Sequence, residues 1–300
     1  MSVRQRQGLA LAFMAVVAFS FSLPWTVWAL ESFSPVLTAT GRAAIAGVIA
    51  AVILAVARVP RPTRAQIRPL LYTMAGAVFG WPILIALALQ RTTSAHAAVI
   101  AAVMPLVTAI IAVLRTHEHV ARQFWLAAAC GTGALIVFAL LRGGAEGGDF
   151  IADLLIAGAV IASSWCYVEG ATLTRQLPGW QVISWVVVLA LPITIPASLL
   201  IVATGGVTLP ITTQAWLGLV LLGVVSMYFA FFAWYQGLSM AGVARGAQTQ
   251  QLQAPLTLLW SALLLGEVIT WPTIVATLAV VASVTWAVRV RTPTVVAPEE

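Results

Sequence analysis

The stretch that decides how this chain is interpreted reads RGAQTQQLQAPLTLLWSALLLGE and runs from Arg245 to Glu267. It is long enough to cross a bilayer as a helix, yet polar side chains crowd its first half. These are Gln248, Thr249, Gln250, Gln251 and Gln253. Lipid offers no hydrogen-bond partner to such side chains, so most of them must face protein or water.

Pro255 lies at the centre of the same stretch. Proline has no N–H, so the carbonyl of Gln251 loses its helical partner and we expect the helix to bend. A bent, amide-rich helix at membrane depth indicates the wall of a polar path. The alternative is a set of interhelical hydrogen bonds that only hold a bundle together. We expect Gln248 and Gln251 to face the path. Gln250 and Gln253 should then bond to neighbouring helices.

The remainder of the chain is strongly apolar. Hydrophobic residues make up 61% of the sequence and charged residues 8%, with a mean hydropathy of +1.02. No soluble domain of 300 residues can bury so much apolar surface. We therefore predict an all-α integral membrane protein with ten transmembrane helices. They are expected near residues 9–30, 35–57, 69–89, 95–114, 122–141, 151–172, 182–203, 214–237, 242–265 and 270–289.

Arginine placement predicts how these helices are oriented. Arginines gather before the first helix, at alternate joints and after the last helix. They are Arg4, Arg6, Arg58, Arg61, Arg64, Arg68, Arg115, Arg122, Arg175, Arg289 and Arg291. The other joints carry only Arg91 and Arg142. Basic residues near helix ends stay in the cytoplasm. We expect a multi-pass protein of the cell inner membrane with both termini cytoplasmic, and we assign the net charge of +6 to topology rather than to nucleic-acid binding.

The two halves of the chain resemble each other. When Pro105 is placed on Pro255, each is followed by an apolar run that ends at a glutamate, Glu118 or Glu267. The halves, residues 1–145 and 146–300, would hold five helices each. Because five is odd, the second copy must insert upside down, which predicts two inverted five-helix repeats. Such repeats place a substrate site near the midplane, often at broken helices.

Ten helices in two repeats, each closing on a helix with a central proline and a terminal glutamate, resemble the EamA-type drug/metabolite transporters. The motifs that carry the resemblance are Pro105 to Glu118, Pro255 through Gly266-Glu267, Arg42, and Gly131-Thr132-Gly133. Within this superfamily the chain is most similar to YddG-type exporters of aromatic and other neutral amino acids. It departs from the usual pattern where Arg115-Thr116-His117-Glu118 replaces Leu-Leu-Gly-Glu.

Several side chains are candidates for contact with a solute. Deep aromatic residues suit a neutral or zwitterionic ligand with an apolar side chain, although each can also be core packing. The substrate-binding candidates are Trp81, Trp165, Tyr167, Tyr228 and Trp260, together with His96, Gln248 and Gln251; Pro105 and Pro255 mark the helix bends. His96 opens the fourth predicted helix, where a gating or proton role and a plain hydrogen bond near the outer mouth both remain open.

Charged residues limit the transport mechanism. No carboxylate is expected at the midplane, since Glu169 falls near the cytoplasmic end of its helix. This favours a facilitator over a cation/proton antiporter. Arg42 lies within the second predicted helix and can pair with Glu31, with a helix-end carbonyl or with a substrate carboxylate. We expect one of the structural pairings.

The sequence contains no Gly-rich phosphate loop, metal-ligand cluster or nucleophile beside a base, so we predict no catalytic residues, no metal and no cofactor. The resemblance implies a transporter that exports small organic solutes, aromatic and other neutral amino acids above all, by alternating access around a midplane cavity. Its partners would be the small-molecule substrate and the lipid bilayer. The alternatives are a multidrug or other metabolite exporter of the same fold, and a membrane enzyme or scaffold whose polar helix is structural.

Overall fold

The computed structural model describes residues 3–116, 149–241 and 248–290, with short pieces between 122 and 137. In these residues the regular structure is helical, apart from one isolated bridge between Phe33 and Val207. The first half contains α1 (Val3–Ser20), α2 (Ser22–Leu30), α3 (Pro35–Val56), α4 (Arg64–Met74), the π-helix η1 (Ala75–Gly80), α5 (Trp81–Ala88), α6 (Ser94–Ala101) and α7 (Met104–Thr116). The second half contains α9 (Phe150–Leu173), α10 (Gly179–Ala203), α11 (Thr213–Leu221), the π-helix η2 (Leu222–Phe229), α12 (Ala230–Ala241), the 3₁₀ helix η3 (Gln248–Leu252), α14 (Gln253–Leu265) and α15 (Trp271–Val290).

The helices are long and apolar enough for a membrane. In the described part of the chain, seven stretches could cross a bilayer by length and composition, and Trp271–Ser283 is a shorter apolar helix. The seven are Val3–Leu30, Pro35–Val56, Arg64–Ala88, Ser94–Arg115, Phe150–Leu173, Gly179–Ala203 and Thr213–Ala241. The predicted all-α membrane class is thus confirmed. The predicted helix at 122–141 lies largely outside the described residues, and the count of ten stays a prediction.

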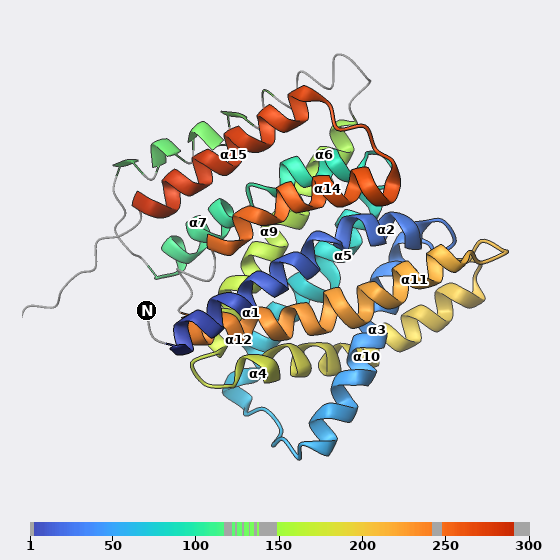
Figure 1. Ribbon diagram of the computed structural model, residues 1–300. Helices are drawn as coiled ribbons and strands as arrows, with labels where there is room; N and C mark the ends of the chain where they lie inside the picture. The colour runs from blue at the N-terminus through green and yellow to red at the C-terminus, as the bar shows by residue number, and fades with distance from the viewer. Residues whose placement is uncertain are drawn as a thin grey trace, which may run out of the picture.

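The helices form one bundle around a shared core (Figure 1). α1 packs along α12, α3 packs along α10, and α9 packs against α4, η1 and α5. α15 lies at one edge of the bundle and contacts α6, α7 and η3. Segments far apart in the sequence therefore meet at the centre, where the broken helices lie.

Proline accounts for the break between α1 and α2. Pro24 cannot donate to the carbonyl of Ser20, which would be its partner in a continuous helix. The hydroxyl of Thr257 on α14 donates to that carbonyl instead, at 2.9 Å. Trp260 Nε1 donates to Ser20 Oγ at 2.9 Å, and the Trp260 ring stacks on Phe21 at 4.2 Å. The break is thereby tied to α14.

Pro105 and Pro255 also stand at breaks, but the outcome differs from the predicted bend. α6 ends at Ala101 and α7 begins at Met104, immediately before Pro105. In the second half, η3 gives way to α14 at Gln253, so Pro255 lies in the first turn of a new helix. Proline is tolerated there because first-turn amides have no helical partner. The chain therefore changes helix at both prolines instead of bending one helix.

The helix ends fall into two groups. At one end, the Ser34 amide donates to the Gly206 carbonyl at 2.9 Å, which joins the α2–α3 turn to the α10–α11 turn. A second contact between helix ends joins α14 to α6. The carboxylate of Glu267, after α14, accepts from the Ser94 amide at the start of α6 at 2.9 Å. We call the side of the bundle that holds the start of α6 the Glu267 end. The side that holds the end of α7, with Arg115, is the Arg115 end.

Glycine permits a close helix contact in the core. A Cβ added to Gly76 of η1 would lie 2.2 Å from the Ala162 carbonyl oxygen and 2.7 Å from Cys166 Cβ, both on α9. The backbone of Ala162 cannot move away from the added methyl group as the end of a flexible side chain could. We therefore expect Gly76→Ala to destabilise the protein by about 1–3 kcal/mol through overpacking, measured as a lower Tm in detergent. Gly133→Ala is the control, because its Cβ would meet nothing within 4 Å. Equal melting temperatures for the two variants would contradict this packing.

Candidate functional site

Two adjoining cavities lie where the broken helices meet. We name them after one lining residue each, the proline cavity (Pro105) and the arginine cavity (Arg42). The proline cavity is lined by Leu23, Trp81, Ala98, Ala101, Ala102, Met104, Pro105, Gln250, Gln253, Ala254 and Thr257. The arginine cavity is lined by Phe19, Ser22, Arg42, Ala77, Trp81, Met104, Ser163, Tyr167, Ser226, Phe231 and Gln253.

The cavities are narrow in this state. Each has a volume of about 20 Å³, which is room for about one water molecule. Trp81, Met104 and Gln253 line both and so form the wall between them. The structure is therefore contracted around the site. A larger occupant would require these shared side chains or their helices to move, and Met104 has a flexible side chain suited to that.

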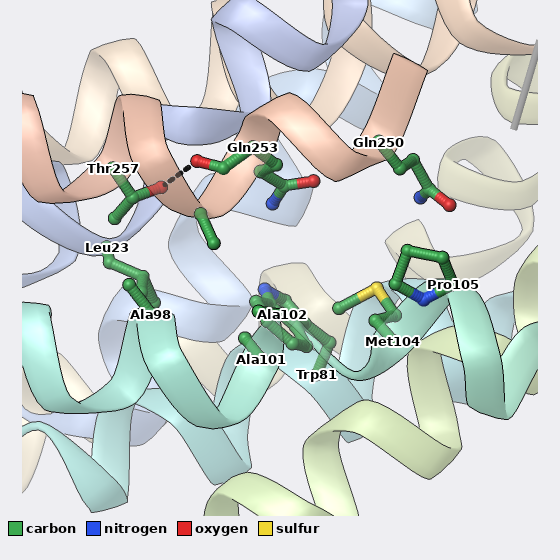
Figure 2. Close-up of a pocket in the computed structure, with 11 residues that line it drawn as sticks. Leu23, Trp81, Ala98, Ala101, Ala102, Met104, Pro105, Gln250, Gln253 and Thr257 are labelled. Carbon is green, nitrogen blue, oxygen red and sulfur yellow. Dashed lines mark hydrogen bonds between the residues drawn. The ribbon is translucent and has the colours of Figure 1, made fainter. Parts of the chain in front are cut away.

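The proline cavity lies between α14 and the α6–α7 break, as Figure 2 shows. Gln253 extends from α14 toward the side that carries Trp81 and Ala102, and Gln250 points toward Pro105. Gln250 is 4% exposed, and neither atom of its amide makes a hydrogen bond within normal limits to the described residues. The carbonyl of Ala101 also lacks its usual helical hydrogen bond, because Pro105 has no N–H. Unused polar atoms thus gather at a small, otherwise apolar cavity.

The arginine cavity contains a buried positive charge. Arg42, on α3, is 3% exposed, and its Nη2 donates to Ser226 Oγ at 3.0 Å. The Ser226 hydroxyl also shares a hydrogen bond of 2.5 Å with the Ser22 hydroxyl. Nε of Arg42 has no acceptor, and no carboxylate of the described residues forms an ion pair with the guanidinium.

The expected structural pairing of Arg42 is therefore wrong. Glu31 is exposed and accepts from Thr212 Oγ1 at 2.9 Å, a contact between the end of α2 and the start of α11. Arg42 begins the third turn of α3, roughly 10 Å along the helix at 1.5 Å per residue, and faces inward. The two groups are on different parts of the fold, and among the described residues the guanidinium bonds with one neutral hydroxyl.

The aromatic candidates separate into two groups. Trp81 and Tyr167 line the cavities. Tyr228 is fully buried and its hydroxyl bonds with that of Ser184 at 2.9 Å, while Trp260 belongs to the stack on Phe21. Trp165 is 42% exposed on α9. The structure thus brings two of the five candidates together at the site, and neither cavity lining includes Tyr228, Trp260 or Trp165.

The amides present the opposite face to the one that the sequence favoured. Gln250 and Gln253 line the cavities, whereas Gln251 Oε1 accepts from Thr285 Oγ1 of α15 at 2.6 Å. The side chain of Gln248 lies outside the described residues. Gln250 and Gln253 are three residues apart, and in a 3₁₀ turn such residues eclipse each other. Helical spacing alone groups them together but does not say which group faces inward; the position of α15 decides it.

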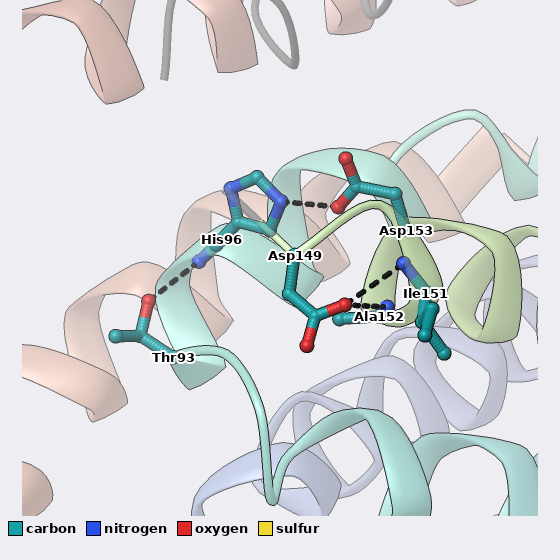
Figure 3. A network of polar contacts seen from close by, with 6 residues as sticks. All are labelled: Thr93, His96, Asp149, Ile151, Ala152 and Asp153. Atoms are coloured by element: carbon teal, nitrogen blue, oxygen red, sulfur yellow. Dashed lines mark hydrogen bonds and ion pairs between the residues drawn. The ribbon is translucent and has the colours of Figure 1, made fainter. Parts of the chain in front are cut away.

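His96 lies at the Glu267 end and lines neither cavity. Figure 3 shows the polar contacts around it. Its Nε2 is 2.6 Å from Asp153 Oδ1 on α9, and its backbone amide donates to Thr93 Oγ1 at 3.2 Å. Beside this pair, Asp149 caps α9 and bonds with Arg91 at 2.5 Å. That hydrogen bond from Arg91 lowers the pKa of Asp149 below its usual value. The interpretation of His96 as a hydrogen-bonding residue at a helix end agrees with this arrangement.

Glu267 has a role that the sequence did not reveal. Its carboxylate accepts from the amides of Ser94 and Ala95 at 2.9 and 2.8 Å, so it caps α6 from the end of α14. Gly266 adopts φ +66°, which lets the chain turn the glutamate back toward α6. The Gly266-Glu267 ending and the Ser94-Ala95 start of α6 were visible in the sequence. Only the fold shows that they meet.

At the Arg115 end, one ion pair joins α7 to α9. Arg115 Nε lies 3.2 Å from Glu169 Oε1, and the Glu169 side chain is 5% exposed. Glu169 therefore has a partner near its helix end, and no carboxylate of the described residues lines either cavity. The Glu118 position lies outside the described residues.

Three comparisons relate the chain to known proteins. The EamA-like transporter family model matches residues 6–140 and 150–289. The chain is 38% identical over 282 residues to the uncharacterized transporter YdeK of Bacillus subtilis (strain 168), covering 94% of this chain and 97% of that one. A protein of known crystal structure has a similar fold at a TM-score of 0.66 and 19% identity, covering 93% of this chain and 97% of that protein.

Proposed function

The chain belongs to the EamA-like transporter family, and on that premise we propose that it carries aromatic and other neutral amino acids across the inner membrane. The observation that carries the proposal is the meeting of two broken helices at two adjoining cavities. Trp81 and Tyr167 supply aromatic walls, and Gln250 and Gln253 supply amides. Such a lining suits a small solute with one apolar part and one polar part.

Alternating access requires two related halves, and the packing supports an inverted repeat. The first predicted helix packs on the eighth (α1 on α12), and the sixth packs on the third (α9 on α4, η1 and α5). The second packs on the seventh (α3 on α10), and the fourth on the ninth (α6 on α14). Exchanging the halves converts the first two pairings into each other and leaves the last two unchanged. We propose two five-helix units, residues 1–145 and 146–300, with the cavities at their interface.

The orientation follows from the same arrangement. Arg115 and the exposed Arg58, Arg61, Arg64 and Arg68 stand at turns that the arginine rule assigns to the cytoplasm. We propose that the Arg115 end faces the cytoplasm, together with both termini. The Glu267 end then faces outward, and the contacts at Glu267 and His96 close the cavities from that side.

We propose facilitated movement without obligatory proton coupling. A proton-driven carrier commonly needs an ionisable acid along its path, and each described carboxylate lies at a helix end, outside the cavity linings. The imidazole of His96 is engaged with Asp153.

The test is flux in proteoliposomes that contain the purified protein. Radiolabelled L-phenylalanine should equilibrate across the membrane faster than in protein-free liposomes, and the rate should persist when the pH gradient is collapsed. Accumulation against a concentration gradient that needs only protons would overturn the facilitative mechanism. An absence of flux for every neutral amino acid would overturn the substrate assignment, and an absence of flux for every organic solute would favour a scaffold or enzyme.

A further inference from the structure

We propose that Arg42, positioned by Ser226, is the subsite for a carboxylate. The transported solute is then a small monocarboxylate whose apolar part lies toward the proline cavity. This inference rests on the proposed transport function and names the chemical group by which the solute is recognised. It also predicts which solutes the site rejects.

The first argument is the unpaired charge. A buried guanidinium without a counter-charge is costly unless an anion joins it. Every described carboxylate has another partner. Glu31 bonds with Thr212, Asp149 with Arg91, Asp153 with His96, Glu169 with Arg115, and Glu267 with the α6 amides. None of these side chains lines the arginine cavity, so no described carboxylate supplies the counter-charge, and we assign that position to the carboxylate of the solute.

The second argument is donor geometry. A guanidinium presents five N–H donors in a planar fork that matches a carboxylate. Arg42 makes one hydrogen bond to the described residues, from Nη2 to Ser226, and its Nε is unused. The hydroxyl of Ser226 is itself held by Ser22. The side chain is therefore fixed from one edge while donors remain for an incoming anion.

The rest of the arginine cavity suits an anion and not a cation. Hydroxyls of Ser22, Ser163, Tyr167 and Ser226 line it. Ser163, Tyr167 and one of the bonded pair Ser22 and Ser226 can donate to a carboxylate oxygen. An ammonium group finds only neutral acceptors such as the amide oxygen of Gln253. A zwitterion can thus bind through its carboxylate. An organic cation would be repelled by the positive charge of Arg42, and it has no carboxylate to offset that repulsion.

The position of the proline cavity predicts how the bound solute is oriented. It shares Trp81, Met104 and Gln253 with the arginine cavity and continues into the small apolar side chains of Ala98 and Ala101. A solute with its carboxylate on Arg42 would pass its apolar part between Trp81 and Met104 into this space.

The test compares an acid with its amide of the same shape. Binding of 3-phenylpropanoate and 3-phenylpropanamide to the purified protein is measured by ligand-induced stabilisation and by tryptophan fluorescence. We expect the acid to bind at least about thirtyfold more tightly than the amide, as for other buried charge pairs that lose one partner. Arg42→Gln should abolish this preference. Arg68→Gln should retain it, since Arg68 is exposed and bonds with Tyr72.

Each outcome decides the proposal. Equal binding of acid and amide by the wild type would overturn it, as would a preference that survives in Arg42→Gln. If Arg42→Gln does not fold, the wild-type comparison and Ser226→Ala decide instead, because Ser226→Ala should reduce the preference severalfold. If the acid binds through Arg42 but L-phenylalanine is not transported, the amino acid assignment fails and the subsite stands. If L-phenylalanine is transported equally by wild type and Arg42→Gln, the subsite fails and the transport function stands.

Discussion

Replacing Gln253 by leucine should lower the L-phenylalanine flux by roughly tenfold or more while leaving the melting temperature nearly unchanged. The amide of Gln253 lines both cavities and makes no hydrogen bond with the described residues, so its removal leaves no protein group unpaired. A polar or charged group of the solute would lose its partner, which is worth about 1.5–3 kcal/mol for a charged group. The measurement is initial flux in proteoliposomes, normalised to folded protein.

Gln251→Leu is the matched control, two residues away on the same segment. Gln251 bonds with Thr285 of α15, so the variant should cost about 0.6–2 kcal/mol of stability for a lost interhelical hydrogen bond. The flux for each folded molecule should stay near that of the wild type. If Gln253→Leu lost stability and kept its flux, while Gln251→Leu did the reverse, the assignment of the two faces would be wrong.

Removing the carboxylate of Glu267 should open the cavities toward the outside. The carboxylate ties α14 to the first amides of α6, where the helix dipole also favours a negative charge. Losing one such charged hydrogen bond, worth about 1.5–3 kcal/mol, would change the ratio of open to closed molecules roughly 10- to 150-fold. Glu267→Ala, which removes both acceptors, should change the ratio by at least this factor. Glu267→Gln, which keeps one acceptor, should have an intermediate effect.

The shift can be measured with a cysteine in the proline cavity. In a background of Cys130→Ser and Cys166→Ala, Ala98→Cys should react faster with a membrane-impermeant maleimide from outside when Glu267 is replaced by alanine. Glu31→Ala is the control, since Glu31 is exposed on the same side of the bundle but joins α2 to α11 through Thr212. Unchanged labelling of Ala98→Cys in a folded Glu267→Ala protein would show that the cap does not control access.

The sequence predicted the features that depend on composition and on backbone chemistry. The helical membrane class follows from the apolar runs, and the breaks near Pro105 and Pro255 follow from the missing N–H. A proline in the sequence does not reveal whether one helix bends or a new helix begins. The missing N–H of Pro255 is tolerated in the first turn of a helix as well as at a bend. In the structure Pro255 lies in the first turn of α14.

The features that depend on tertiary contacts were missed. Helical spacing groups Gln250 with Gln253, but only the position of α15 against Gln251 decides which group faces the cavities. Arg42 was expected to pair with Glu31 or with a helix-end carbonyl, because its helix is not one of the broken ones. No local pattern shows that Glu31 would lie at an exposed turn and that Ser226, far along the chain, would be the only partner of the guanidinium in the described residues.

The central claim is that solute passes between the two helix breaks, and substrate protection of a single thiol tests it most directly. In the background without native cysteines, Gln253→Cys should react with a water-soluble maleimide in proteoliposomes, and saturating L-phenylalanine should slow that reaction. Gln251→Cys, on the face that contacts α15, should react slowly with or without the amino acid. A Gln253→Cys thiol that is inaccessible from water on both sides of the membrane, or that reacts at the same rate with and without every transported solute, would contradict the account.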